Sequence, residues 1–319
     1  MPEKIEIPSQ TIFRVVLILF ILLFLFLIRD VLLIFFVALV VVSALSPAVD
    51  FLQSKKVPRI LSTLLIFLIS LSALGLVIYL LVPPLVEQIS ALARNLPKYL
   101  ETLPFDLKAS YFQDLLGKIG DYLASVPTGL SSIFVILVIS FYLLIQKNGI
   151  QGFLKIFTPS KHREYALDLF SRIQKKLGYW LLGQLTSCIL VAVLTFIGLF
   201  FLKVPYALVL ALAVGIAEII PFGPVVAFIP AGILAFMQSP LTGILVIALY
   251  LLVQQTEGNI IVPQIMKKAV GLNPVTVILA VLIGAKLAGI LGLLVAIPAA
   301  AALSVFIKDI MNRRKKYDQ

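Results

Sequence analysis

Long apolar segments, each bounded by charged or turn-forming residues, account for most of the chain. Each segment is long enough to cross a hydrocarbon core of about 30 Å, since a helix rises about 1.5 Å per residue. The pattern therefore predicts an all-α polytopic membrane protein with about six to eight transmembrane helices. The apolar segments are Ile12–Ile28, Val31–Leu52, Ile60–Val82, Leu130–Ile145, Leu177–Leu202, Pro205–Met237, Leu241–Val262 and Pro274–Ile307.

Two polar regions interrupt this series and orient it. Residues 84–127 carry four Lys/Arg and five acidic residues, whereas residues 147–176 carry seven Lys/Arg and two acidic residues. Because basic loops are retained in the cytoplasm, we expect residues 147–176 and both termini inside and residues 84–127 outside. Apolar positions in the outer region repeat at helical spacing, which favours amphipathic helices at the interface or a small packed helical cap. The chain thus divides into a three-helix membrane region 1–83, the extracytoplasmic segment 84–127, and a transport region 128–319.

Composition excludes several classes of protein. The chain is 61% hydrophobic and 13% charged, with a mean hydropathy of +1.12, so a soluble fold could not bury its apolar surface. The net charge of +11 comes from cations that flank apolar spans. This pattern is typical of the cytoplasmic loops of a protein in the lipid bilayer and not of a nucleic-acid-binding protein. With one cysteine, Cys188, and one histidine, His162, no metal site or other cofactor is expected. The first apolar segment is too long for a signal-peptide core and predicts an uncleaved anchor.

The apolar segment Pro205–Met237 contains a helix break beside its one carboxylate, Glu218, which precedes Pro221, Gly223 and Pro224. Proline lacks the N–H that a helix needs and clashes with the preceding turn. Backbone groups freed inside a membrane must be buried in protein or line a wet cavity. Because burying a charge there costs about 2.5–3.5 kcal/mol, an ionisable group at such a break indicates an ion or substrate site. The alternative is that the carboxylate only caps the broken helix.

A second polar group of residues lies near the end of the next apolar span. Two of its members stand four residues apart, on one helical face. Such a stripe either lines a pathway or joins helices through buried hydrogen bonds. Further along, Lys286 either extends to an interface or pairs with one of the two carboxylates. The residues of the stripe are Gln254, Gln255, Glu257 and Asn259.

The second half of the chain contains an internal repeat at an offset of 69 residues, which pairs Gly215 with Gly284 and Gly223 with Gly292. If each unit is a span followed by a re-entrant hairpin, the two units have opposite orientations, as in many secondary transporters. Lys267 then lies inside, as the charge rule prefers. If the broken segments instead cross the membrane once, this lysine lies outside.

These motifs resemble the AI-2E family of membrane transporters, which is named for autoinducer-2 export. The most specific elements are Glu-x-x-Pro-x-Gly-Pro at 218–224 and Glu-Gly-Asn-x-x-x-Pro at 257–263. One departure is Asn273 before Pro274, where we expect the family to have histidine. The other matching elements are Ile28–Leu32, Pro47–Asp50, Pro83–Leu85, Gly183 with Gln184, Gly289–Gly292 and Ala296–Pro298.

The resemblance implies a homo-oligomeric transporter of the cytoplasmic membrane, with a pentamer as one arrangement. It implies either export or exchange of a small solute, such as an autoinducer-2-like signal or a metabolite, or sodium(lithium)/proton antiport. The chain has no Gly-x-x-x-x-Gly-Lys-[Ser/Thr] loop, so we expect transport without ATP hydrolysis. An intramembrane enzyme would need converging nucleophile and base residues, and a structural scaffold leaves the helix breaks unexplained.

The hairpin hypothesis predicts the side of the membrane on which Lys268 lies. In a Cys188→Ser background, we expect Lys268→Cys to resist a membrane-impermeant thiol reagent in intact cells, because the residue faces the cytoplasm. A cysteine placed between Leu103 and Lys108 should react and serves as the control. External labelling at position 268 would contradict two re-entrant hairpins.

Overall fold

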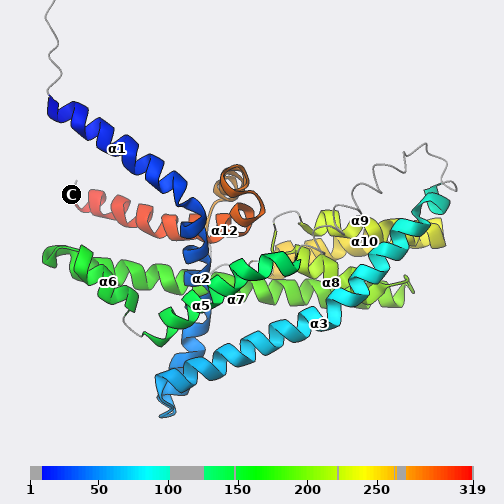
Figure 1. Ribbon diagram of the computed structural model, residues 1–319. Coiled ribbons are helices and arrows are strands. Elements are labelled where there is room, and N and C mark those ends of the chain that lie inside the picture. Colours follow the sequence, from blue (N-terminus) through cyan, green and yellow to red (C-terminus); the bar gives the residue numbers. More distant parts are fainter. Residues whose placement is uncertain are drawn as a thin grey trace, which may run out of the picture.

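The computed structural model describes residues 9–100, 126–146, 149–220, 223–261, 263 and 271–317, and its regular elements are all helical (Figure 1). This confirms the all-α class. The helices are α1 (Ser9–Leu27), α2 (Arg29–Ser54), α3 (Arg59–Leu100), α5 (Val126–Ile145), α6 (Gly149–Phe157), the short η1 (Ser160–His162), α7 (Arg163–Phe201), α8 (Ala207–Ala217), α9 (Gly223–Gln238), α10 (Pro240–Thr256), the π-helical η2 (Glu257–Ile261) and α12 (Pro274–Tyr317).

The apolar segments expected to span a membrane all coincide with helices. Among the described residues, five stretches are long and apolar enough to cross a bilayer, and shorter apolar helices accompany them. The protein is therefore a multi-pass membrane protein. The five stretches are Arg29–Ser54, Arg59–Leu80, Ser160–Phe201, Pro240–Ile261 and Leu291–Met311.

Helix α3 continues well beyond its apolar part. It has 42 residues, so at about 1.5 Å per residue it is roughly twice as long as the hydrocarbon core is thick. The amphipathic run that begins at Leu85 belongs to this helix, and the region boundary expected at residue 83 falls within it. Residues 101–125, which hold the rest of the expected extracytoplasmic segment, lie outside the described residues.

Helices α2 and α7 cross in close contact, and a proline and a glycine make this approach feasible (Figure 1). Pro47 lies inside α2 and has no N–H, so the carbonyl of Ser43 one turn earlier receives no helical hydrogen bond from it. Gly178 of α7 packs against that carbonyl, and a Cβ on Gly178 would lie 2.5 Å from Ser43 O. Because Gly178 has no side chain, the α7 backbone can pack over the Ser43 carbonyl, which receives no hydrogen bond from Pro47 within α2.

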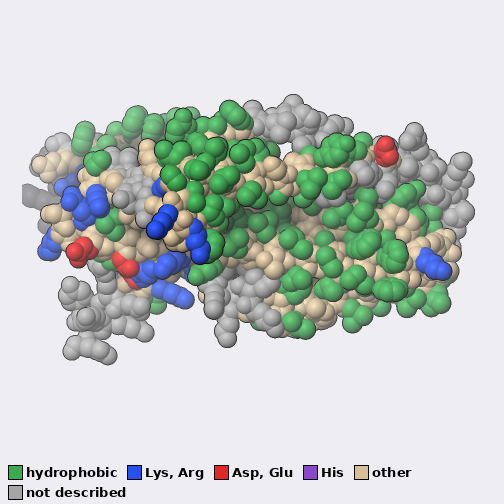
Figure 2. Space-filling view, turned by 90° about the horizontal axis from the view of Figure 1, so that it is seen from below, with side chains coloured by type: hydrophobic (Ala, Val, Ile, Leu, Met, Phe, Trp, Pro, Cys, Tyr) green, Lys and Arg blue, Asp and Glu red, His purple; other side chains and the backbone are tan. Residues whose placement is uncertain are grey.

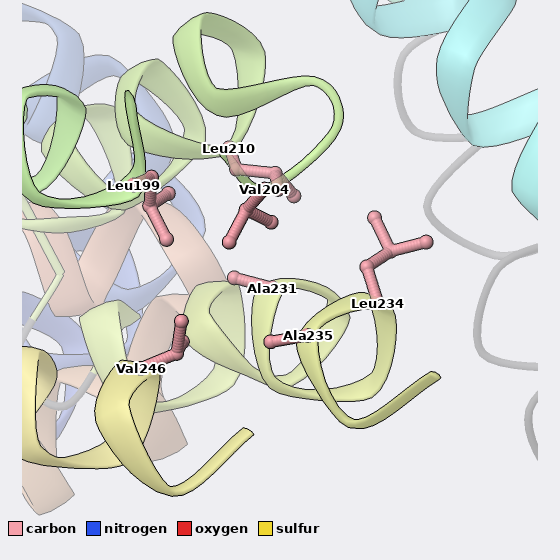
Figure 3. Packing of buried hydrophobic residues seen from close by; sticks show 7 residues of the cluster. All are labelled: Leu199, Val204, Leu210, Ala231, Leu234, Ala235 and Val246. Carbon is pink, nitrogen blue, oxygen red and sulfur yellow. The ribbon is translucent and has the colours of Figure 1, made fainter. Parts of the chain in front are cut away.

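Helices α8 and α9 form a hairpin whose two ends meet. The side-chain Nε2 of Gln238, the last residue of α9, donates a 2.8 Å hydrogen bond to Lys203 O, just before α8. Figure 3 shows Leu210 of α8 facing Ala231 and Leu234 of α9 within one buried cluster. Because α8 has only 11 residues, its length of about 16 Å is about half a hydrocarbon core. The chain enters and leaves this hairpin at one end, as the re-entrant hypothesis requires.

The backbone of α12 turns sharply at Ala288 and Gly289. Ala288 has φ −145° and ψ 22°, and Gly289 has φ 57° and ψ −133°, a left-handed conformation that suits glycine. The carbonyl of Gly292 packs against Gly284, whereas residues eight apart in a continuous helix would be about 12 Å apart. In Figure 1 the part of α12 before this turn, in brown, runs in a different direction from the part after it, in red.

The glycine pairs that suggested the repeat thus flank both breaks. Gly215 and Gly223 lie on either side of the break between α8 and α9, and Gly284 and Gly292 lie on either side of the turn in α12. None of the four has room for a Cβ without displacing a neighbour. The matched positions support two structural repeat units, α7–α9 and α10–α12.

Charged side chains gather at one end of the molecule, around α6 and the start of α7, and apolar side chains cover much of the remaining surface in this view (Figure 2). At this end Arg172 of α7 makes two 2.8 Å hydrogen bonds to the carboxylate of Asp309 in α12. Lys176 Nζ donates to Ser304 Oγ at 2.8 Å. These contacts join the two repeat units at the charged end.

The close crossing of α2 and α7 predicts that adding a single methyl group at position 178 destabilises the protein. We expect Gly178→Ala to lower the thermal unfolding midpoint of the purified protein, because overpacking against a backbone carbonyl costs about 1–3 kcal/mol. Gly75→Ala in α3 is the matched control, since no atom lies within 4 Å of its Cβ position. That control should be neutral or stabilising. Equal midpoints for the two variants would contradict the close contact.

Candidate functional site

Glu218 lies at the C-cap of α8, where the chain begins the break toward α9. Its backbone N–H still bonds Val214 O at 3.1 Å, and Ile219 and Ile220 then make shorter turns to Ile216 O and Ala217 O. Helix α9 starts at Gly223, which packs against the carbonyl of Ala217 with no space for a side chain. The break therefore holds the Glu218 side chain and its freed carbonyl at the tip of the hairpin.

Gln184 of α7 supplies the partner for that freed carbonyl. Its Nε2 donates a 2.8 Å hydrogen bond to Glu218 O, and its side chain is only 8% exposed. A buried carbonyl without a partner costs about 1–3 kcal/mol. Gly215 allows α8 to approach α7 at the same level, since its Cβ position lies 2.6 Å from Ala192 Cβ and 2.8 Å from Cys188 O.

The carboxyl group of Glu218 is close to a second one. Glu257, the first residue of η2, is its main charged neighbour, and Gln254 Nε2 donates to Glu257 Oε2 at 3.2 Å. The Tyr250 phenol, which stacks on Phe228 with ring centroids 4.3 Å apart, lies within electrostatic reach of both carboxyl groups. We call this group the carboxyl cluster and define it as Gln184, Cys188, Glu218, Tyr250, Gln254 and Glu257.

Two polar atoms of the carboxyl cluster are buried without a hydrogen-bond partner among the described residues: Glu218 Oε2 and Tyr250 Oη. Most buried polar atoms in proteins are hydrogen-bonded. A hydroxyl and a carboxylate oxygen can together bind a proton, a monovalent cation or a polar group of a solute. No cluster of three or more His, Cys, Asp or Glu residues that could hold a metal ion occurs in the described part of the chain.

The local backbone adds to this interpretation, because Glu257 opens a π-helix. Residues Glu257–Ile261 follow α10 with π geometry, in which each hydrogen bond spans five residues instead of four. Such segments are rare and frequently mark functional sites. Here the π-helix and the break at Glu218 bring two irregular backbone segments and two carboxyl groups together inside the bundle.

Comparisons with known proteins identify the family of this chain. A family profile described as AI-2E family transporter matches residues 15–312. The chain belongs to the AI-2E family. YueF of Bacillus subtilis (strain 168) is 29% identical and YrrI of the same organism 28%, with 84% and 86% of this chain and 80% and 84% of the relatives covered. Protein sll0060 of Synechocystis sp. is 29% identical over 88% of this chain and 87% of its own length. The names of these AI-2E relatives describe transport in general terms and specify no solute.

Other residues expected at the site of this AI-2E protein lie elsewhere. Gln255 and Asn259 are exposed and bonded to each other, with Asn259 Nδ2 donating to Gln255 Oε1 at 2.9 Å. Asn273 Oδ1 accepts a 3.0 Å hydrogen bond from Val275 N and so caps the start of α12. Lys286 is exposed, and no contact with Glu218 or Glu257 is found for it within the described residues. Pro224 is buried in the first turn of α9, and Pro221 lies outside the described residues.

Two members of the carboxyl cluster were missed by the sequence analysis: Cys188 and Tyr250. A signal for them exists in the spacing. Tyr250, Gln254 and Glu257 are separated by four and three residues, which places them on one helical face. Cys188 follows Gln184 by four residues and shares its face for the same reason.

The hydrogen bond from Gln184 to the Glu218 carbonyl predicts that a variant of similar size without the amide is less stable. Gln184→Leu should reduce the free energy of unfolding by about 1–3 kcal/mol, because the Glu218 carbonyl then lacks its donor. Gln255→Leu, which changes an exposed glutamine, is the control and should change stability by less than about 0.5 kcal/mol. Thermal unfolding of both purified variants measures the difference. A Gln184→Leu protein as stable as the control would contradict the role assigned to this hydrogen bond.

Proposed function

We propose that this AI-2E family protein is a secondary transporter that moves a small solute across the cytoplasmic membrane, with Glu218 and Glu257 binding the coupling cation. One observation carries this proposal. Two neighbouring carboxyl groups lie at a helix break about half a bilayer from the hairpin's open end, and one of their oxygens is buried and unpartnered. Ionisable groups inside a membrane bundle are costly and are retained for function.

The chemistry of the carboxyl cluster suits a small cation. Two carboxylates in a poorly hydrated site repel each other, so a proton or a monovalent cation bound between them is favoured. The groups that face Glu218 are Glu257 from η2, Tyr250 from α10 and Cys188 from α7. None of these groups is basic, so the cluster offers no internal counter-ion for the two carboxylates.

The arrangement of the repeat units supports transport over the other classes considered. Broken helices that meet inside the bundle, contributed by two repeat units, are the usual plan of secondary transporters. The units α7–α9 and α10–α12 each contribute one carboxylate to the cluster. A scaffold would not need this construction. An intramembrane enzyme would be expected to place a nucleophile and a base together. We therefore propose a transporter without catalytic activity.

Sodium(lithium)/proton antiport is the second candidate function, because the carboxyl cluster alone would suffice for it. In that case the cation is itself the cargo and no organic solute is needed. In the first candidate, a metabolite or a signal of the autoinducer-2 type is exported or exchanged, and the cation gradient drives it. We also propose that the protein works as a homo-oligomer in the cytoplasmic membrane with both termini inside.

Coupling through Glu218 predicts a changed pH profile in a variant that keeps the shape of the site. In proteoliposomes of purified protein, sodium-dependent proton flux followed with an internal pH dye should vary with pH in the wild type. Glu218→Gln should flatten this profile or abolish the flux, because the amide cannot exchange a proton. Glu164→Gln, in the first turn of α7 outside the apolar part, is the control and should keep the wild-type profile.

The outcomes separate the candidates. Sodium-driven proton flux without added solute favours antiport, whereas flux only with an organic solute inside favours solute exchange. A Glu218→Gln profile identical to the wild type would show that the carboxylate only caps α8. Lack of any gradient-dependent flux for the wild-type protein under all these conditions would contradict a transporter.

A further inference from the structure

A cavity of about 420 Å³ lies at the charged end of the bundle, between α2, the start of α3, α5, α6 and α7. Its wall on α7 includes Gln174, Gly178 and Leu182, which succeed each other at four-residue spacing and form one helical stripe. Gln184, which belongs to the carboxyl cluster, lies about 200° around α7 from Leu182, since each residue turns a helix by about 100°. The cavity and the carboxyl cluster are therefore on different faces of α7 and share no residue, so they are separate sites.

Arg59 holds one wall of this cavity in place. Its Nη1 bonds Asp50 Oδ1 at 2.8 Å and Gln53 Oε1 at 3.0 Å. Its Nε donates to Leu144 O at 3.0 Å and Ile145 O at 3.2 Å, at the C-terminal end of α5. One side chain thus ties α2, the start of α3 and the end of α5 together. The cavity wall is preformed, which reduces the entropy lost when a ligand binds.

The opposite wall is also fixed, by the contact of Gly178 with the Ser43 carbonyl. Ser43 and Ser46 donate their hydroxyl hydrogens to Leu39 O and Val42 O, at 2.6 and 2.7 Å. Their oxygens keep free lone pairs and can accept hydrogen bonds from a ligand. The α2 wall is therefore polar as well as rigid.

The charged side chains that line the cavity leave one positive charge in excess. Asp50 and Arg59 neutralise each other through their ion pair, and Lys175, also in the lining, has no ion-pair partner within the described part of the chain. The side chains of Gln146 and Gln174 line the cavity too, and neither has an intramolecular hydrogen bond among the described residues. Each amide offers donors and an acceptor to a ligand.

From this combination we propose that the cavity binds a small organic anion with one acidic group on a polar body. The Lys175 ammonium attracts the carboxylate or phosphate, and the amides of Gln146 and Gln174 bond its hydroxyl or carbonyl groups. Two sources share this chemistry: a water-soluble metabolite and the headgroup of an anionic lipid. The site stands independently of the cation chemistry at Glu218, because the cavity shares no residue with the carboxyl cluster.

Binding to the full-length protein in phosphatidylcholine nanodiscs tests this proposal. The probes are glycerate, glycerol 1-phosphate, glycerol as the uncharged analogue, and dihexanoyl phosphatidic acid as the short-chain lipid. Titration calorimetry and the thermal unfolding midpoint are the measurements, since a ligand of the folded state raises that midpoint. We expect saturable binding of at least one anion and none of glycerol. Binding of the phosphatidic acid alone upholds the site and identifies a lipid headgroup as its ligand.

Two variants and one matched control locate the site. Lys175→Gln removes the charge from an exposed position and should weaken anion binding about tenfold or more, a loss of about 1.4 kcal/mol. Gln174→Leu keeps the charge and should also weaken binding. Lys161→Gln removes an exposed charge at the same end of the molecule but outside the cavity, and it should bind like the wild type.

Two results would overturn the proposal. One is the lack of saturable binding for all three anions. The other is an equal loss of affinity in Lys161→Gln and Lys175→Gln, which would indicate general attraction of anions to the basic end of the protein. The flux measurements on Glu218 do not depend on either result.

Discussion

A backbone group freed inside an apolar bundle is costly unless another helix covers it, and this constraint shapes the packing of α7 against α2 and α8. The break after Glu218 leaves its carbonyl without a helical donor, and Gln184 from another helix supplies the hydrogen bond at 2.8 Å. The same constraint arises in α2, where Pro47 gives no donor to the Ser43 carbonyl and Gly178 packs over it. In both places a residue of α7 covers a defect in a neighbouring helix. Helix α7 thus stabilises two irregularities that would each be unfavourable in contact with lipid.

Close backbone contact takes the place of hydrophobic burial in holding these helices together. Lipid tails are as apolar as leucine side chains, so burying leucine between helices gains little in a membrane. Small residues allow backbones to approach instead. Gly215 of α8 lies against Ala192 and the Cys188 carbonyl of α7, and Gly243 of α10 lies against the Phe236 ring of α9. This explains why the outer faces of α1 and α3 are apolar and exposed while these two glycines lie at the helix contacts.

The helices and the break between α8 and α9 were predictable because each leaves a local mark on the sequence. A long apolar run identifies a span, and Pro221 with Gly223 identifies the break without any knowledge of neighbours. The stripe at the end of α10 was predicted only in part. Each residue turns a helix by about 100°, so Gln254 and Glu257 lie on one face and Gln255 and Asn259 on another. Gln254 and Glu257 therefore join the carboxyl cluster, while Gln255 and Asn259 are exposed and bonded to each other.

A site whose walls come from segments far apart in the sequence leaves no local pattern from which it could be predicted. The cavity beside Lys175 takes its walls from five helices. Arg59 pairs with Asp50 in its lining, which leaves the Lys175 charge without an ion-pair partner among the described residues, and this pairing is a fact of three-dimensional structure. Likewise, the sequence indicated a new segment after residue 83 because its composition becomes polar there. The helix nevertheless continues to Leu100, because a change from lipid to water alters which side chains are favourable but does not by itself end a helix.

Helix α7 contributes residues to the carboxyl cluster on one face and to the cavity beside Lys175 on another face. A rotation of this helix would therefore alter the geometry of both sites together. Linkage then requires that each ligand alter the affinity for the other by the same factor. Any such movement between the repeat units must also strain the paired hydrogen bonds of Arg172 to Asp309. Arg172 is 41% exposed, and ion pairs with solvent access are worth only about 0–1 kcal/mol. The contact between the two units can therefore break at little cost in free energy.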